Sequence, residues 1–204
     1  MKKIVVGADP FPPYQYVDKK GKIKGLDYET VIKQFRMAGY DPEVYIEPWN
    51  IIYKKFEEGK VDALFQVQDS PERLKKYFFS KILRYAVTEV VTTDEKLTEI
   101  DTYDQLRKYK IGVIDGFVNG TEIDEMPDEC KIIFADTKSL LEGIEHEKVK
   151  CGICDKGVKE FLNEDTSKIL SITKLTFKRP LYVMFQNEKD RDAFDEAKNL
   201  KIVG

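Results

Sequence analysis

The segment Asp69-Ser70-Pro71-Glu72-Arg73 combines a helix start with a cation that can bind a carboxylate. Asp or Ser at the N-cap, Pro in the first turn and an acid near the positive end of the dipole are typical of a helix N-terminus. Backbone N–H groups at such an end attract anions, and the guanidinium of Arg73 can bind a carboxylate through two hydrogen bonds. The pattern predicts a carboxylate pocket; the alternative is that Arg73 pairs with a surface acid such as Glu72 or Asp69.

A second candidate wall of a binding site is the loop Asp9-Pro10-Phe11-Pro12-Pro13-Tyr14, which follows the apolar segment 3–7. Proline fixes φ, so the prolines of this loop hold the rings of Phe11 and Tyr14 in place at little further entropy cost. Preformed aromatic walls of this kind suit ligand binding. The alternative is that the two rings fill the core of their own lobe.

The cysteines and the single histidine offer little for catalysis or metal binding. Cys130, Cys151 and Cys154 are an odd number, so no disulfide framework is implied. The spacing of Cys151 and Cys154 suits redox or metal chemistry, but the pair lies in an apolar, strand-like run and no second pair exists. We therefore expect a structural role in the core for these cysteines, a solvated surface position for His146, and no metal or cofactor.

Charge and hydropathy exclude two classes of partner. The 204 residues carry 34 basic and 37 acidic side chains, and no basic tract could follow a phosphate backbone, so nucleic acid is not an expected partner. No apolar run approaches the roughly 20 residues that a bilayer requires, so we expect no direct membrane insertion by this chain. Met1-Lys2-Lys3 leads into an apolar strand without a signal-peptide region, which predicts a cytosolic chain, or an exported one whose targeting segment is removed.

Strand and helix alternate along the whole sequence. Apolar residues recur at helical spacing in 28–35 and 49–56, and Gly39 and Gly59 stand where each helix should end. Short apolar runs between the helical segments predict strands. Such alternation predicts an α/β fold in which parallel sheets are covered by helices on both faces. The expected strands are 3–7, 43–46, 63–66, 111–114, 131–135, 151–154, 169–172 and 181–185, and the further expected helices are 137–146, 156–162 and 189–200.

The sequence also predicts that the chain passes between two lobes twice. Apolar residues 86–91 run into the polar stretch 92–95, and a second crossing is expected at 176–180, before the last strand and helix. Two connections make a hinge, and a hinged cleft between Rossmann-like lobes is a trap for a small ligand. We expect a discontinuous first lobe of residues 1–91 and 181–204, a second lobe of residues 94–177, and a two-stranded hinge near 92–93 and 178–180.

Short motifs stand in the same order here as in one known family. In the first half they are Asp9 to Tyr14, Gly25 to Glu29, Trp49, Gly59 to Ala63, Ser70 to Arg73 and Phe79-Ser80, and in the second half they are 111–116 and 151–155. With these motifs the chain resembles the extracellular solute-binding proteins of the polar amino-acid type, family 3, over nearly its whole length. The family includes ABC-transporter receptors and sensor domains, and the resemblance implies a periplasmic-binding-protein-like fold of type II.

The resemblance implies how a ligand would be held. Phe11 and Trp49 would sandwich its side chain, Arg73 would bind its α-carboxylate, and Asp155 would neutralise an α-ammonium, because charges in a closed cleft need such partners. Trp49 also lies on the apolar stripe of its helix, and the alternative for Asp155 is a cap on the helix that starts at Lys156. The expected ligand-binding residues are Asp9, Phe11, Tyr14, Trp49, Gln66, Gln68, Ser70, Arg73, Phe117, Val118 and Asp155.

Two departures from the family pattern bear on the ligand. Gln66 and Gln68 stand where small hydroxyl residues are usual, which predicts a smaller and more polar pocket. Phe117 and Val118 replace a hydroxyl pair, so part of the expected carboxylate cradle is missing from the second lobe. The loop 116–120 is similar to that of a divergent branch, in which ligand identity is poorly predictable from sequence.

Three functions remain open at this stage. The resemblance implies a receptor, periplasmic or extracellular with its signal segment absent from this chain, that closes on an amino acid or related carboxylate and presents it to a membrane permease. The alternative is the sensing domain of a membrane-bound signalling receptor such as a histidine kinase. The family's usual further helix is missing after 201–204, which fits either a minimal free-standing receptor, the favoured interpretation, or such a sensing domain. A dehydratase-like enzyme is disfavoured, since no nucleophile stands beside a base, and we expect no catalytic residues.

Overall fold

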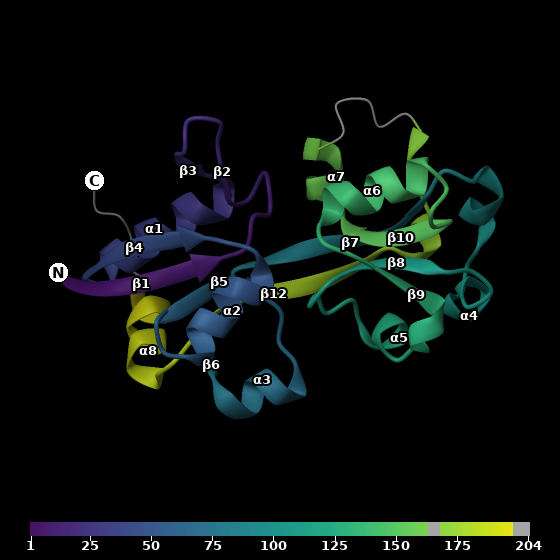
Figure 1. The fold of residues 1–204 in the computed structure, drawn as a ribbon. Coiled ribbons are helices and arrows are strands. Elements are labelled where there is room, and N and C mark those ends of the chain that lie inside the picture. The colour runs from purple at the N-terminus through teal and green to yellow at the C-terminus, as the bar shows by residue number, and fades with distance from the viewer. Residues whose placement is uncertain (163–167, 198–204) are drawn as a thin grey trace. The chain divides into compact units, whose positions relative to one another are not determined.

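The chain divides into two units, each with its own sheet, in a computed structural model that describes residues 1–162 and 168–197 (Figure 1). Unit 1 contains Met1–Tyr85 and the segment that begins at Pro180, and unit 2 contains Ala86–Arg179. Strands β7 (Arg84–Thr92) and β12 (Phe177–Phe185) each cross the division. Residues 178–180, where the sequence analysis placed part of a hinge, therefore lie within a strand.

The sheet of unit 1 is mixed. Its strand order is β4-β1-β5-β12, and β1 (Lys2–Ala8) runs parallel to β4 (Tyr40–Ile46) and β5 (Ala63–Val67). Strand β12 pairs with β5 in the antiparallel direction, and so does the short β6 (Phe78–Phe79) with β12. The expectation of a parallel sheet is therefore correct for β1, β4 and β5 and wrong for β12 and β6. Parallel neighbours need a crossover connection, usually a helix, and β12 enters the unit without one.

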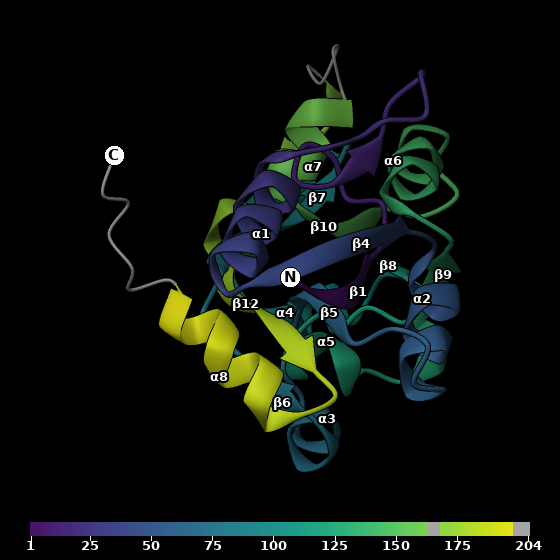
Figure 2. The same ribbon diagram turned by 90° about the vertical axis from the view of Figure 1, so that its left-hand side faces the viewer.

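Helices cover both faces of this sheet, as expected (Figure 2). One face packs against α1 (Leu26–Met37) and α8 (Glu188–Ala197), whose Phe35 and Phe194 rings lie 4.7 Å apart between centroids. The other face packs against α2 (Trp49–Glu57). Residues 198–200 of the expected last helix lie outside the described residues. The remaining elements are the hairpin β2 (Tyr16–Val17) and β3 (Ile23–Lys24), and the short helix α3 (Pro71–Lys76).

The sheet of unit 2 is mixed as well. Its order is β7-β10-β8-β9, in which β10 (Cys151–Asp155), β8 (Ile111–Ile114) and β9 (Lys131–Phe134) are parallel. Strand β7 pairs with β10 and with the short β11 (Leu170–Ser171) in the antiparallel direction. Here too the parallel expectation fails at the strand that crosses the division.

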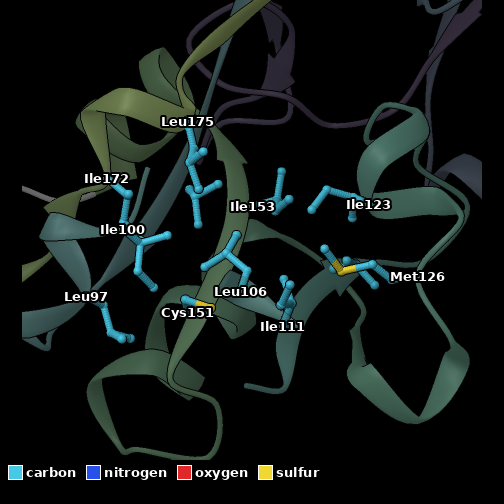
Figure 3. Close-up of a cluster of buried hydrophobic side chains, with 12 residues drawn as sticks. Leu97, Ile100, Leu106, Ile111, Ile123, Met126, Cys151, Ile153, Ile172 and Leu175 are labelled. Atoms are coloured by element: carbon cyan, nitrogen blue, oxygen red, sulfur yellow. The ribbon is translucent and has the colours of Figure 1, made fainter. Parts of the chain in front are cut away.

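Unit 2 buries apolar side chains on both faces of its sheet. Figure 3 shows the larger cluster, in which Cys151 and Ile153 of β10 meet Leu106 of α4 (Tyr103–Leu106) and Ile123 of α5 (Thr121–Asp124). The opposite face packs against α6 (Thr137–Glu145), and α7 (Lys156–Leu162) lies beside α6. The connections also contain the 3-10 helices η1 (Glu95–Glu99), η2 (Asp128–Cys130) and η4 (Thr173–Leu175).

Two cysteines and one lysine of unit 2 lie in its interior and have structural roles there. Cys151 and Cys154 are buried, as expected, and desolvation raises the pKa of each thiol to about 12, which keeps both unreactive. Lys159 of α7 is also buried, where its Nζ lies 2.5 Å from Oε2 of Glu89 and 2.7 Å from Oγ of Ser171. This closed set of contacts satisfies both buried charges.

Candidate binding site

The loop after β1 forms an aromatic ledge on unit 1. The backbone N–H of Phe11 donates to the carbonyl of Gln15 at 2.7 Å, which closes the loop into a tight turn. Phe11 is buried, Tyr14 is half-buried, and their rings stack at 5.9 Å between centroids with 24° between planes. Phe11 therefore contributes to the interior of unit 1, and the contact of either ring with a ligand stays a prediction.

This ledge is pinned to the start of α1. The carbonyl of Tyr14 accepts hydrogen bonds from the N–H groups of Asp27 at 3.0 Å and Tyr28 at 3.1 Å, and so replaces a side-chain cap. Gly25 permits this approach, since a Cβ there would lie 2.1 Å from the Tyr14 carbonyl oxygen and its φ is 132°. The helix and the aromatic loop therefore hold each other in place.

Asp9 is a buried carboxylate at the start of the aromatic loop. It is 8% exposed, and no basic side chain among the described residues forms an ion pair with it. Desolvation raises its pKa to about 7, opposed only by a hydrogen bond from its own backbone N–H. The neighbouring Gln15 is buried too, and its amide donates to the Asp9 carbonyl at 3.1 Å. A buried acid whose pKa is raised by desolvation in this way is typical of a functional site.

Arg73 lies on α3 over two aromatic rings. Ser70 caps this helix, as expected, by accepting the Arg73 backbone N–H at 3.2 Å. The guanidinium carbon is 5.1 Å from the ring centroid of Trp49 and 5.3 Å from that of Tyr53, within cation-π range. Its Nη1 donates to the carbonyl of Gln68 at 3.0 Å, so Gln68 contacts Arg73 through its main chain.

The alternative of a surface ion pair for Arg73 is not realised in the described part of the chain. Glu72 pairs with Lys76 instead, with Nζ and Oε1 2.9 Å apart, and Asp69 forms no ion pair with Arg73. Trp49 also packs against the core beneath α2, which is the structural role that the sequence analysis considered for it, and its contact with a ligand stays a prediction. The half-buried Arg73 guanidinium therefore keeps donors for an external carboxylate.

Gln66 belongs to a polar cluster that the sequence analysis missed. Its side-chain amide donates to Oδ2 of Asp27, and its Oε1 accepts from Nη2 of Arg84 at 3.0 Å. Arg84 also donates from Nε to Oδ2 of Asp27 at 2.7 Å, and its guanidinium carbon lies 3.5 Å from the ring centroid of Tyr14. The amide expected on the pocket floor is therefore already bonded within unit 1.

The expected residues of unit 2 are placed around two of its strand ends. Phe117 follows β8 and packs partly against the core under α6, and the carbonyl of Val118 accepts from Nη1 of Arg179. Asp155, at the end of β10, is buried and accepts the backbone N–H of Val158 at 3.1 Å. The capping role considered for Asp155 is therefore present.

In unit 1 the structure brings the expected residues into two groups. The first group is the aromatic loop with Asp9, Phe11 and Tyr14, and Arg84 connects it to Gln66 by contacting both Tyr14 and Gln66. The second group lies at the start of α3, where Arg73 contacts Trp49, Gln68 and Ser70. A signal for the missed pair existed: Asp27 is an acid in the first turn of an amphipathic helix, and Arg84 is a basic residue at the start of the largely apolar strand β7. Among the described residues no cluster of acidic, histidine or cysteine side chains could hold a metal ion.

The comparison with known families rests on nearly the whole chain. The sequence model of the bacterial extracellular solute-binding proteins, family 3, matches residues 4–197. The chain belongs to this family. A probable amino-acid ABC transporter-binding protein of Haemophilus influenzae is 30% identical over 111 residues, which cover 53% of this chain and 43% of that protein. The L-cystine-binding protein TcyJ of Escherichia coli is 27% identical over 114 residues, covering 54% and 42%.

Solved structures of binding proteins share the fold of this solute-binding protein. A Gly52Ala mutant of arginine-bound ArgBP from T. maritima superposes with a TM-score of 0.83 at 16% identity, covering 98% of this chain and 96% of that one. The arginine-, lysine-, histidine-binding protein ArtJ from Geobacillus stearothermophilus gives 0.81 at 23% identity, covering 96% and 87%. At such identities the likeness shows the fold alone. The matched segments span less than half the length of the curated relatives.

Proposed function

We propose that this chain captures an amino acid for ABC-type uptake, with Arg73 as the partner of the ligand's α-carboxylate. The observation that carries the proposal is a half-buried guanidinium stacked over two aromatic rings, with no acidic side chain paired to it among the described residues. Hydrogen bonds between a guanidinium and a carboxylate are charge-assisted and are among the strongest in proteins. Relatives that are named for binding amino acids support this ligand class.

Two carboxylates are proposed to receive the ligand's N–H groups. Asp155 of unit 2 is the proposed partner of the α-ammonium, because it ends a strand at a helix start and is buried. Asp9 of unit 1 is the second, because its carboxylate lacks a cation among the described residues and its raised pKa reflects that cost. A ligand N–H group that bonds to Asp9 would offset part of the desolvation.

Capture is proposed to involve movement of unit 1 against unit 2, as the two-strand connection through β7 and β12 allows. A ligand that contacts both units would favour the arrangement that it binds best. Small-angle X-ray scattering with and without saturating ligand measures this. A smaller radius of gyration with ligand is the expected result, and identical profiles would argue against such movement.

The proposed partner is a membrane permease, and the proposed location is periplasmic or extracellular, in keeping with the family's description. No helix in the described ranges 1–162 and 168–197 combines the length and the apolar character that crossing a bilayer demands. The relatives named above are transport binding proteins, which favours uptake over a signalling receptor or a dehydratase. We propose that the chain is a binding protein and not an enzyme.

A thermal-shift panel of the common amino acids and small carboxylic acids tests this function. Ligand at about 100 times its dissociation constant stabilises a protein by about 2.7 kcal/mol, which is a shift of several degrees for a domain of this size. At least one amino acid should produce it in the wild type. Arg107→Ala, which removes an exposed arginine paired with Asp104, is the matched control and should keep the shift. No shift with any compound would overturn the proposal.

A further inference from the structure

Arg84 occupies a position on unit 1 that is built to receive a guanidinium. Three kinds of acceptor surround it: the Asp27 carboxylate at 2.7 Å from Nε, the Gln66 amide oxygen at 3.0 Å from Nη2, and the face of Tyr14 at 3.5 Å from the guanidinium carbon. A carboxylate, an amide oxygen and an aromatic face together satisfy the charge, the donors and the plane of the group. The same three acceptors match the charge, donors and plane of any guanidinium, although a free one would pay the entropy cost of association.

The surroundings of this position are fixed without the help of Arg84. Asp27 lies in the first turn of α1, which the Tyr14 carbonyl and Gly25 anchor to the aromatic loop. The side-chain amide of Gln66 donates to Asp27. Gln66 lies within β5 and has a left-handed backbone conformation with φ of 63°, which the surrounding strand pairing must stabilise. The acceptors are therefore preorganised, and they should stay in place if the cation is removed.

The Arg84 side chain is also reachable from solvent. It is 18% exposed, whereas the Asp27 carboxylate beneath it is 10% exposed. Burial raises the pKa of Asp27, although the charge and hydrogen bond of Arg84 and the amide of Gln66 act in the opposite direction. An Asp27 without Arg84 would therefore need another cation or a proton.

We propose that Arg84 is a specificity-determining residue, a built-in cation that fills a guanidinium-binding position and so prevents a ligand's cationic side chain from using it. The inference deepens the proposed function, because the position adjoins the Phe11 and Tyr14 ledge. Its consequence is that removal of one side chain converts this position into a binding site for guanidinium compounds such as arginine. The wild type should discriminate against such side chains here.

The test is chemical rescue of Arg84→Ala by methylguanidinium at about pH 8, where Asp27 without its partner is more fully ionised. Wild type, Arg84→Ala and Arg84→Lys are melted with 0 to about 20 mM methylguanidinium chloride, and sodium chloride balances the ionic strength. We expect a rise of several degrees for Arg84→Ala and none for the wild type or for Arg84→Lys, whose ammonium fills the charge position. Titration calorimetry should show methylguanidinium binding to Arg84→Ala at least about tenfold tighter than to the wild type.

A double variant identifies the acceptor. Asp27→Asn/Arg84→Ala should lose the rescue, since a neutral amide cannot pair with the added cation. If Arg84→Ala does not fold alone, refolding in methylguanidinium but not in sodium chloride is the supporting result. The inference would be overturned if methylguanidinium shifted the wild type, Arg84→Ala and Arg84→Lys equally. Rescue that persists in Asp27→Asn/Arg84→Ala would also overturn it. Methylguanidinium contains no amino-acid group, so the rescue of Arg84→Ala can succeed or fail whether or not any amino acid stabilises the wild type. The two proposals can therefore fail separately.

Discussion

Replacing Asp9 by Asn should make the ligand-free protein more stable. The Asp9 side chain is buried, no cation is paired with it in the described part of the chain, and its pKa is raised from 3.8 to about 7 by desolvation. A neutral amide of the same shape avoids the cost of a buried charge, although it loses the charge-assisted bond from the Asp9 backbone N–H. The gain should therefore depend on pH.

The sign and size follow from the two pKa values. Between about pH 4 and pH 7 the unfolded chain has lost this proton while the folded chain retains it, so the free energy of unfolding falls as the pH rises. The difference of about 3.2 between the pKa values corresponds to about 4 kcal/mol, at about 1.4 kcal/mol for each unit of pKa. Above pH 7 the cost is constant. Asp9→Asn should remove most of it at pH 8 and almost none below pH 4.

Urea unfolding at several pH values between 4 and 8 measures the effect. The stability of the variant relative to the wild type should grow along this series, and Asp41→Asn, at an exposed position of β4, should show no such growth. Amino-acid binding should weaken in Asp9→Asn even as stability rises. A variant with the stability and the pH profile of the wild type would refute the reasoning, because Asp9 would then be solvated or paired.

Two further substitutions test how the site is supported. Lys159→Ala leaves the buried Glu89 carboxylate without its cation and should cost about 3 to 5 kcal/mol in urea unfolding, whereas the exposed Lys156→Ala should cost less than about 0.5 kcal/mol. Gly25→Ala places a Cβ against the Tyr14 carbonyl and should lower the melting temperature more than Gly21→Ala, which has a positive φ but meets no neighbour within 4 Å. Equal losses within either pair would contradict the contacts described.

Local patterns in the sequence predicted most elements of the fold. Helical spacing placed α1 and α2 to within a few residues, and Ser70-Pro71 predicted the start of α3 correctly, because these signals act within one turn of chain. The helix expected at 137–146 is confirmed as α6. The direction of β12 and β7 in their sheets was not predictable in this way. Strand direction depends on how a segment enters a sheet, and an apolar run carries no such information.

The candidate site was predictable where one motif carries it and not where distant segments meet. The carboxylate-binding potential of Arg73 followed from five adjacent residues. The Asp27 and Arg84 pair joins α1 to β7, 57 residues apart. The Gln66 amide was expected in the pocket from its position in the family pattern, and nothing near it in sequence shows that Asp27 and Arg84 lie beside it. Tertiary polar clusters of this kind need the fold before their members can be matched.

Calorimetric titration of the most stabilising amino acid into wild type and Arg73→Ala tests the central claim most directly. Truncating one partner of a desolvated charge pair costs roughly 2 to 5 kcal/mol, so Arg73→Ala should bind about 30-fold to several thousand-fold more weakly. The ligand-free variant should lose only a small part of its stability, through the missing cation-π contacts and the hydrogen bond to Gln68. Arg73→Lys should recover part of the loss, because it keeps the charge but not the two-bond geometry. Binding of Arg73→Ala within about threefold of wild type, a difference below roughly 0.7 kcal/mol, would contradict the assignment of Arg73 as the carboxylate partner.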